Sequence, residues 1–152
     1  MYQPFVDDKD GNGTTIYALK GYGAQGITRN ERNDNKLILT TTRTHGSKEV
    51  DQSIELLKPD DVIKVGGAGY KVLLIIQGRA DVYVFPTPGT KKWDTCGPEV
   101  VLGEYGGTIT DTRGNKLEYH NGVDLHNRIG FVATMKNHDQ YIEKLKSLYP
   151  KL

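Results

Sequence analysis

Strand-like and helix-like segments alternate along most of this sequence, and this alternation restricts the possible fold more than any other feature. Residues 37–42 are apolar or β-branched, which is typical of a strand in a buried sheet. After them Ser47 can accept the hydrogen bond that begins a helix, and Val50, Ile54 and Leu57 recur at the spacing of one helix face. A strand, a loop and a helix therefore follow one another in this segment.

The same succession continues towards the end of the chain. The elements expected from these patterns are a strand at 37–42, a helix from 48 to 58, a strand at 62–65, a helix at 70–77, a strand at 81–85, a helix at 98–105, paired strands at 108–112 and 116–119, a strand near 129–133 and a final helix from about 137. Because helices separate successive strands, we expect some of the strands to run parallel. The sequence predicts an α/β fold, a layered mixed sheet with flanking helices.

The first 36 residues follow a different pattern. Two β-like pieces, 2–6 and 14–20, flank a segment whose Asp-Gly and Asn-Gly steps favour a hairpin. Two strands alone are marginally stable, so we expect this hairpin to be the remnant of another sheet, either disordered or paired between copies. The sequence thus predicts remnant strands of an amino-terminal sheet over 1–36 and a carboxyl-terminal α/β domain over 37–152.

Residues 21–26 fit the G-x-G-x-x-G pattern of dinucleotide-binding proteins. In those proteins the glycines open a helix inside a βαβ unit, whereas here polar and turn-forming residues follow at 27–35. We therefore expect the glycines to serve a bulge or a tight connection between strands. An oxidoreductase is accordingly a distant alternative.

Charge and composition exclude several classes of partner. The 152 residues include 20 Lys and Arg against 19 Asp and Glu, a formal charge of +1, so nothing indicates a surface for duplex nucleic acid or an anionic membrane. The single cysteine, Cys96, cannot form an internal disulfide and suits a reducing compartment. The longest apolar run, 72–76, is far too short to span a bilayer. We expect a soluble, cytoplasmic protein.

A carboxylate lies at the corner between the expected strand 81–85 and the next helix. Asp94 precedes Pro98, which can start a helix, so unpaired backbone N–H groups of the first turn should point the same way as the carboxylate. A cation and a phosphate could meet at such a corner. The simpler interpretation is a helix-capping Asp94 with Trp93 packed in the core.

Two further junctions between a strand and a helix carry polar residues or glycine. Thr42 and His45 follow the first strand, and Gly67 and Lys71 follow the second. Ligands of open α/β sheets bind beyond the carboxyl ends of strands, where a glycine allows close approach and a lysine supplies positive charge. Taken singly, the same residues could be a turn glycine, a solvated lysine and a loop histidine. Their joint occurrence indicates a binding site.

The segments that carry these residues resemble one known family. The Trp-Asp-Thr-Cys-Gly-Pro-Glu run at 93–99, followed by Gly-Gly at 106–107, resembles the second signature of the inositol monophosphatase superfamily. Residues 40–45, 65–71 and 91–96 are similar to the 3'(2'),5'-bisphosphate nucleotidase branch in particular. The resemblance extends over essentially the whole chain, with separate motifs in the same order.

This resemblance implies a Mg²⁺-dependent, lithium-sensitive phosphatase that converts adenosine 3',5'-bisphosphate to AMP and phosphate. It assigns Asp94 as a metal ligand, and Thr42, His45, Gly67 and Lys71 as contacts of the nucleotide. The metal would turn a water into a nucleophile and stabilise charge on the phosphoryl oxygens.

Other parts of the family pattern are not found in this sequence. The first signature, an Asp-Pro-Leu-Asp-Gly-Thr run, and the Glu that precedes it would supply most metal ligands. We therefore expect the carboxyl-terminal half of such an enzyme, inactive alone and dependent on the missing amino-terminal half or a second copy. Glu99 and Glu104 are the nearest spare carboxylates, and we do not expect them to replace the missing ligands. A non-catalytic nucleotide-binding or structural module, or half of an inositol phosphate phosphatase, remain alternatives.

Overall fold

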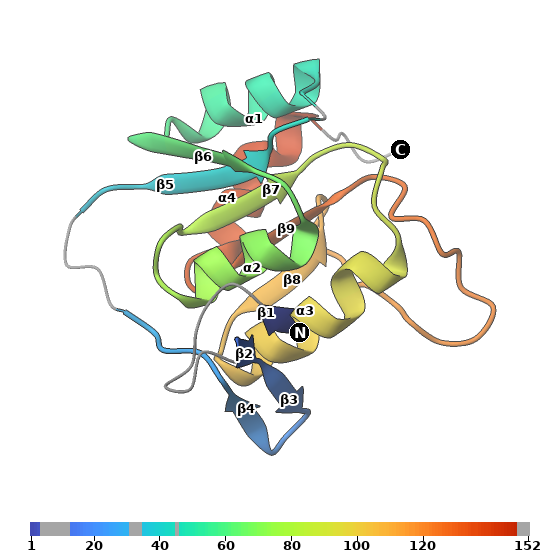
Figure 1. Cartoon of the computed structure of the whole chain (residues 1–152). Coiled ribbons are helices and arrows are strands. Elements are labelled where there is room, and N and C mark those ends of the chain that lie inside the picture. Colours follow the sequence, from blue (N-terminus) through green and yellow to red (C-terminus); the bar gives the residue numbers. More distant parts are fainter. Residues whose placement is uncertain (4–12, 31–34, 45, 149–152) are drawn as a thin grey trace.

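The computed structural model describes residues 1–3, 13–30, 35–44 and 46–148 (Figure 1). The strands are β1 (Tyr2–Gln3), β2 (Thr14–Thr15), β3 (Tyr17–Leu19), β4 (Gly23–Gln25), β5 (Ile38–Thr42), β6 (Asp61–Val65), β7 (Val82–Phe85), β8 (Thr108–Asp111) and β9 (Phe131–Thr134). The helices are α1 (Lys48–Leu57), α2 (Ala68–Ile76), α3 (Lys92–Glu104), α4 (His138–Leu145) and the 3-10 helix η1 (Lys146–Leu148). Among these described elements no helix is long and apolar enough to cross a membrane.

Five strands form one mixed sheet in the order β6-β5-β7-β9-β8. The strands β5, β6 and β7 run parallel, because α1 and α2 carry the chain back between them. The strands β9 and β8 add to the β7 side in antiparallel orientation. The expected α/β fold with a layered mixed sheet and flanking helices is confirmed.

Helices cover both faces of this sheet, and the alternation of side chains along β7 shows how. Val82 and Val84 pack with Leu57 of α1 and Leu145 of α4 on one face. The intervening side chains of β7 face the other way and pack with the residues of α2 and α3. In Figure 1, α1 and α4 accordingly lie on one side of the sheet, and α2 and α3 on the other. The carboxyl ends of β5, β6 and β7 meet at one edge between these layers.

The amino-terminal strands form two small antiparallel pairs, β1 with β2 and β3 with β4. The expected pairing of the first two β-like pieces is confirmed for residues 2–3 and 14–15, while most of the expected turn, 4–12, lies outside the described residues. The strand β3 contacts α3, and Ile16 is fully buried in the same core as α2 and α3. These pairs therefore pack on the α2 and α3 side of the molecule (Figure 1).

The glycine-rich run 21–26 belongs to the β3–β4 pair. Leu19 pairs with Gly23 across a tight turn, and the N–H of Tyr22 donates to the carbonyl of Leu19 at 2.9 Å. The expected tight connection between strands is confirmed, and no helix follows these glycines in the described residues up to 30.

The predicted start of the third helix was wrong. The helix α3 begins at Lys92, so Pro98 lies inside it, and the carbonyl of Asp94 receives no N–H from position 98. The helix begins early because the Asp94 carboxylate turns back and accepts the backbone N–H of Lys91 at 2.8 Å, as in a capping box. Trp93 is 59% exposed and carries the Lys91 ammonium 4.8 Å from its ring centroid, so its expected place in the core was also wrong.

The predicted hairpin of 108–112 with 116–119 was wrong in its second arm. The strand β8 pairs with β9 instead, and residues 116–119 form no strand. The Asp111 carboxylate closes a local turn by accepting the N–H groups of Arg113 at 2.8 Å and Asn115 at 2.9 Å. This turn leads the chain away from the sheet.

Candidate functional site

The carboxyl ends of β5 and β6 bring three of the four predicted nucleotide contacts together. Thr42 pairs in register with Val65, the last residue of β6. Gly67 follows Val65 and precedes α2 with φ at 79°, a conformation that favours glycine. Lys71 lies one turn into α2, and His45 lies outside the described residues.

Lys71 is buried, with 3% of its surface exposed, so it is not a solvated helix residue. Its ammonium donates to the backbone carbonyls of Val65 at 3.1 Å and Gly67 at 3.0 Å. Burial lowers the pKa of Lys71 from its ordinary value of 10.5 to about 8. The side chain is therefore a positive charge held at a fixed place, and it stays protonated at neutral pH.

Tyr83 connects Lys71 to the Asp94 corner, and sequence reasoning missed it. The Lys71 ammonium lies 5.0 Å from the centroid of the Tyr83 ring, which meets Phe131 edge-on at 4.9 Å between centroids. Burial raises the pKa of the Tyr83 phenol, and the nearby charge of Asp94 raises it further. In the sequence Tyr83 is only an aromatic residue in a buried strand, so no signal distinguished it from core packing.

Asp94 can offer one oxygen to a cation. Its Oδ2 accepts the Lys91 N–H at 2.8 Å, and its Oδ1 has no hydrogen-bond partner among the described residues. A carboxylate oxygen is the ligand type that Mg²⁺ prefers. The described residues contain no group of three His, Cys, Asp or Glu side chains that could hold a metal ion. Within the described residues Asp94 is therefore a single candidate ligand rather than part of a complete metal site.

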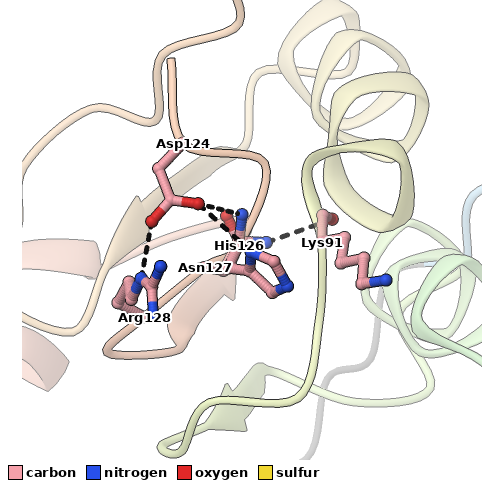
Figure 2. A network of polar contacts seen from close by, with 5 residues as sticks. All are labelled: Lys91, Asp124, His126, Asn127 and Arg128. Carbon is pink, nitrogen blue, oxygen red and sulfur yellow. Dashed lines mark hydrogen bonds and ion pairs between the residues drawn. The ribbon is translucent and has the colours of Figure 1, made fainter.

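A segment between β8 and β9 lies against the start of α3 (Figure 2). The Asp124 carboxylate accepts from the backbone N–H of His126 at 3.0 Å and from Arg128 Nε at 2.5 Å, which holds this segment in a turn. Next to it the side-chain amide of Asn127 donates to the Lys91 carbonyl at 3.2 Å. Sequence reasoning missed Asn127, because nothing in its neighbourhood marks it as more than a loop residue.

The two spare carboxylates of α3 are bound to other groups. Glu104 accepts the backbone N–H groups of Gly21 at 2.8 Å and Gly23 at 2.7 Å, so the glycine-rich turn encloses a carboxylate of the chain itself. Glu99 accepts from the hydroxyl of Tyr119. Burial raises the pKa of Glu99. Neither carboxylate belongs to a group of three possible metal ligands within the described residues.

Two hollows lie near α3. One of about 650 Å³ is lined by Glu99 and Tyr119 among others, and one of about 330 Å³ by Lys92 and Asn127 among others. Neither of these two hollows includes Lys71 or Asp94 in its lining.

Comparison with known proteins decides the family. The model of the inositol monophosphatase family matches residues 1–149. The chain belongs to the inositol monophosphatase family. Within known proteins, it is 46% identical to human 3'(2'),5'-bisphosphate nucleotidase 1 over 133 residues, covering 88% of this chain and 43% of that protein. It is 44% identical to the Dictyostelium discoideum protein of the same name, covering 97% of this chain and 51% of that protein. The chain thus spans about half the length of these relatives.

Solved structures of the family have the same fold. An inositol monophosphatase from Thermotoga maritima matches with a TM-score of 0.68 and 19% identity, covering 91% of this chain and 53% of that one. CysQ from Bacteroides thetaiotaomicron, a bacterial member of the family, matches with a TM-score of 0.63 and 22% identity, covering 80% of this chain and 54% of that one. At these identities the likeness concerns the fold.

Proposed function

We propose that this chain is part of a Mg²⁺-dependent, lithium-sensitive 3'(2'),5'-bisphosphate nucleotidase, a phosphatase that converts adenosine 3',5'-bisphosphate to AMP and phosphate. The observation that carries the proposal is the buried ammonium of Lys71, held beside Gly67 at the carboxyl ends of parallel strands. Ligands of open α/β sheets bind at such ends. The 44–46% identity to bisphosphate nucleotidases supports the nucleotide over an inositol phosphate as substrate.

In this proposal Lys71, Gly67, Thr42 and His45 contact the nucleotide. Among the described residues the Lys71 ammonium donates to two carbonyl oxygens, and a lysine has three N–H donors, so one N–H is left for an anionic oxygen. Gly67 leaves the start of α2 open to a ligand, since a Cβ there would meet only Tyr70, at 3.6 Å.

Members of this family generally depend on Mg²⁺. Asp94 fits as one ligand, because at the strand-to-helix corner it presents a carboxylate oxygen that has no partner among the described residues. A bound Mg²⁺ would supply an activated water and stabilise negative charge on the phosphoryl group. The described residues hold no group of three possible ligands, so we propose that its other ligands come either from the amino-terminal half of a longer enzyme or from a second copy of this chain.

Two measurements on the purified chain test this proposal. Calorimetry should detect weak AMP binding, and Lys71→Met should weaken it by a factor of ten or more, because a charge-assisted contact is worth roughly 1.5–3 kcal/mol. The exposed Lys64 lies on the neighbouring strand β6, and Lys64→Met is a matched control that should leave AMP affinity unchanged. Equal AMP affinity in the parent and Lys71→Met would reject the placement of the nucleotide.

The second measurement is phosphate release from adenosine 3',5'-bisphosphate with Mg²⁺. The chain alone should release none above background, since one carboxylate cannot position the metal, the water and the phosphoryl group. A polypeptide that supplies the missing carboxylates should restore release, and Asp94→Asn should abolish it again. AMP binding without any restored release would favour a non-catalytic nucleotide-binding module. Tighter binding of an inositol phosphate than of AMP would favour an inositol phosphatase.

A further inference from the structure

The side chain of Asn127 holds the first turn of α3 at several points. It is 4% exposed, and its amide nitrogen lies 3.1 Å from Thr90 Oγ1, 3.2 Å from the Lys91 carbonyl oxygen and 3.5 Å from Thr95 Oγ1. The backbone adds two more hydrogen bonds, from the Asn127 N–H to the Thr90 carbonyl at 3.0 Å and from the Lys92 N–H to the Leu125 carbonyl at 2.8 Å. Hydrogen bonds thus attach the segment before β9 to the start of α3 (Figure 2).

The orientation of the Asn127 amide follows from its partners. The Lys91 carbonyl can only accept a hydrogen bond, so the NH₂ group of Asn127 must face it. The other atom of the amide, Oδ1, is buried and has no partner among the described residues. An unpaired buried acceptor costs roughly 1–3 kcal/mol, so the hydrogen bonds by which this side chain stabilises its surroundings come from its NH₂ group.

The Lys91 carbonyl does not need the hydrogen bond from Asn127 to be satisfied. The Lys91 carbonyl already accepts the N–H of Asp94 at 2.9 Å. The second bond, from Asn127, instead fixes the orientation of the Lys91 residue. The Lys91 N–H in turn donates to Asp94 Oδ2 at 2.8 Å. Lys91 therefore links the two side chains: its carbonyl accepts from Asn127, and its N–H donates to the Asp94 carboxylate.

We propose that Asn127 is a positioning residue for Asp94: its side-chain amide fixes Lys91 at the start of α3, and Lys91 then holds the Asp94 carboxylate in place. The role of the held carboxylate, that of a metal ligand, rests on the proposed function. The positioning of Lys91 and Asp94 by these hydrogen bonds does not depend on that function and can be measured separately.

Amide hydrogen exchange measures directly how well the Lys91 N–H is protected by its hydrogen bond to Asp94. In Asn127→Asp the shape is kept, but an oxygen replaces the NH₂ group that faces the Lys91 carbonyl. In Asn127→Ala the side-chain amide is removed. Protection of the Lys91 N–H, relative to amides of the β7–β9 ladder, should fall at least tenfold in both variants. Thr112→Val is the matched control, because Thr112 is also buried and donates to the Ile129 carbonyl at 2.9 Å, a hydrogen bond in which no α3 residue takes part.

A second measurement tests whether the position of Asp94 affects metal binding. With the polypeptide that supplies the missing carboxylates present, Mn²⁺ should broaden the NMR signals of Asp94 and its neighbours in the parent chain, and both Asn127 variants should need at least tenfold more Mn²⁺ for the same broadening. Unchanged relative protection of Lys91 in both variants, or an equal fall in Thr112→Val, would overturn the positioning role. An absence of Mn²⁺ broadening in the parent with that polypeptide present would contradict the metal assignment, and the exchange result would still decide the role of Asn127.

Discussion

The buried ammonium of Lys71 should make the fold less stable while making the binding site possible. Lys71→Met tests this, because methionine has a similar length, carries no charge and can still contact the Tyr83 ring through its sulfur. We expect the variant to lose AMP affinity and yet to unfold less readily at neutral pH. If Lys71 served only stability, the variant would unfold more readily and keep its AMP affinity.

The magnitude follows from the pKa of Lys71. Lowering this pKa from 10.5 to about 8 disfavours the charged amine in the native state by about 3 kcal/mol, at about 1.4 kcal/mol per pH unit. Two hydrogen bonds to the carbonyls of Val65 and Gly67 are lost in the variant, each worth on the order of 1 kcal/mol net. The free energy of unfolding should therefore rise by about 1 kcal/mol at pH 7 in Lys71→Met.

The effect of pH has a definite sign. Between pH 8 and 10.5 the unfolded chain still binds the Lys71 proton while the native protein has released it, so parent stability rises with pH in this window. The variant lacks this gain. Relative to Lys71→Met, the parent should gain about 2 kcal/mol between pH 7 and pH 10, which reverses the order of the two proteins.

Urea unfolding of the parent, Lys71→Met and Lys64→Met at pH 7 and pH 10 measures these differences. The exposed Lys64 should show no such reversal, which separates the buried group from the general titration of lysines. The reasoning would be refuted if Lys71→Met were less stable than the parent by 1 kcal/mol or more at pH 7, or if the difference between them did not change with pH.

Two other positions give sharp expectations. Gly130→Ala should lower the free energy of unfolding by more than about 3 kcal/mol, because a Cβ there would lie 1.9 Å from the Phe85 carbonyl oxygen. Gly122→Ala, with a similar positive φ but open space, should cost only about 1 kcal/mol in urea unfolding, and equal losses would contradict the clash. The Nε2 atom of His138 lies 2.8 Å from Thr110 Oγ1, and its Nδ1 atom lies 2.9 Å from Thr134 Oγ1. Burial lowers the pKa of His138 below 6.5. The parent should therefore lose stability as pH falls below 6.5, because the unfolded chain binds the His138 proton more readily than the native protein does. His138→Gln should lose less, whereas identical pH profiles would argue against this.

The sequence predicted those elements whose ends depend on neighbouring residues. Ser47 was expected to begin a helix, and its hydroxyl accepts the N–H of Val50 at 3.3 Å at the start of α1. The expected end before Pro59 is close to the observed one, where Lys58 follows α1 in the left-handed conformation. The parallel strands β5, β6 and β7 were found within one residue of the expected bounds. Caps, turns and apolar spacing are local, so the sequence displays them.

The elements that were mispredicted depend on contacts between distant segments. Pro98 has the chemistry of a first helical residue, but α3 begins earlier because Asp94 and the segment around Asn127 satisfy its first turn. Residues 116–119 have strand-like composition, but the turn closed by Asp111 leads them away from the sheet, and β8 pairs with β9 instead. The partner of β8 lies more than a dozen residues away, and the start of α3 depends both on the neighbouring Asp94 and on the distant segment around Asn127. Spacing along the chain does not reveal these distant contacts.

The same distinction explains how much of the site could be foreseen. The ends of β5 and β6 had to meet once the strands ran parallel, so grouping Thr42, Gly67 and Lys71 required only the topology. The state of Lys71 required the packing of α2 on α3 and on Tyr83, because a lysine one turn into a helix is solvated unless other layers cover it. Burial is what turns this lysine into a fixed charge with a lowered pKa, and burial is a property of the assembled layers. For that reason Lys71→Met, which separates charge from packing, tests the site more directly than a change at any residue that the sequence pattern alone singles out.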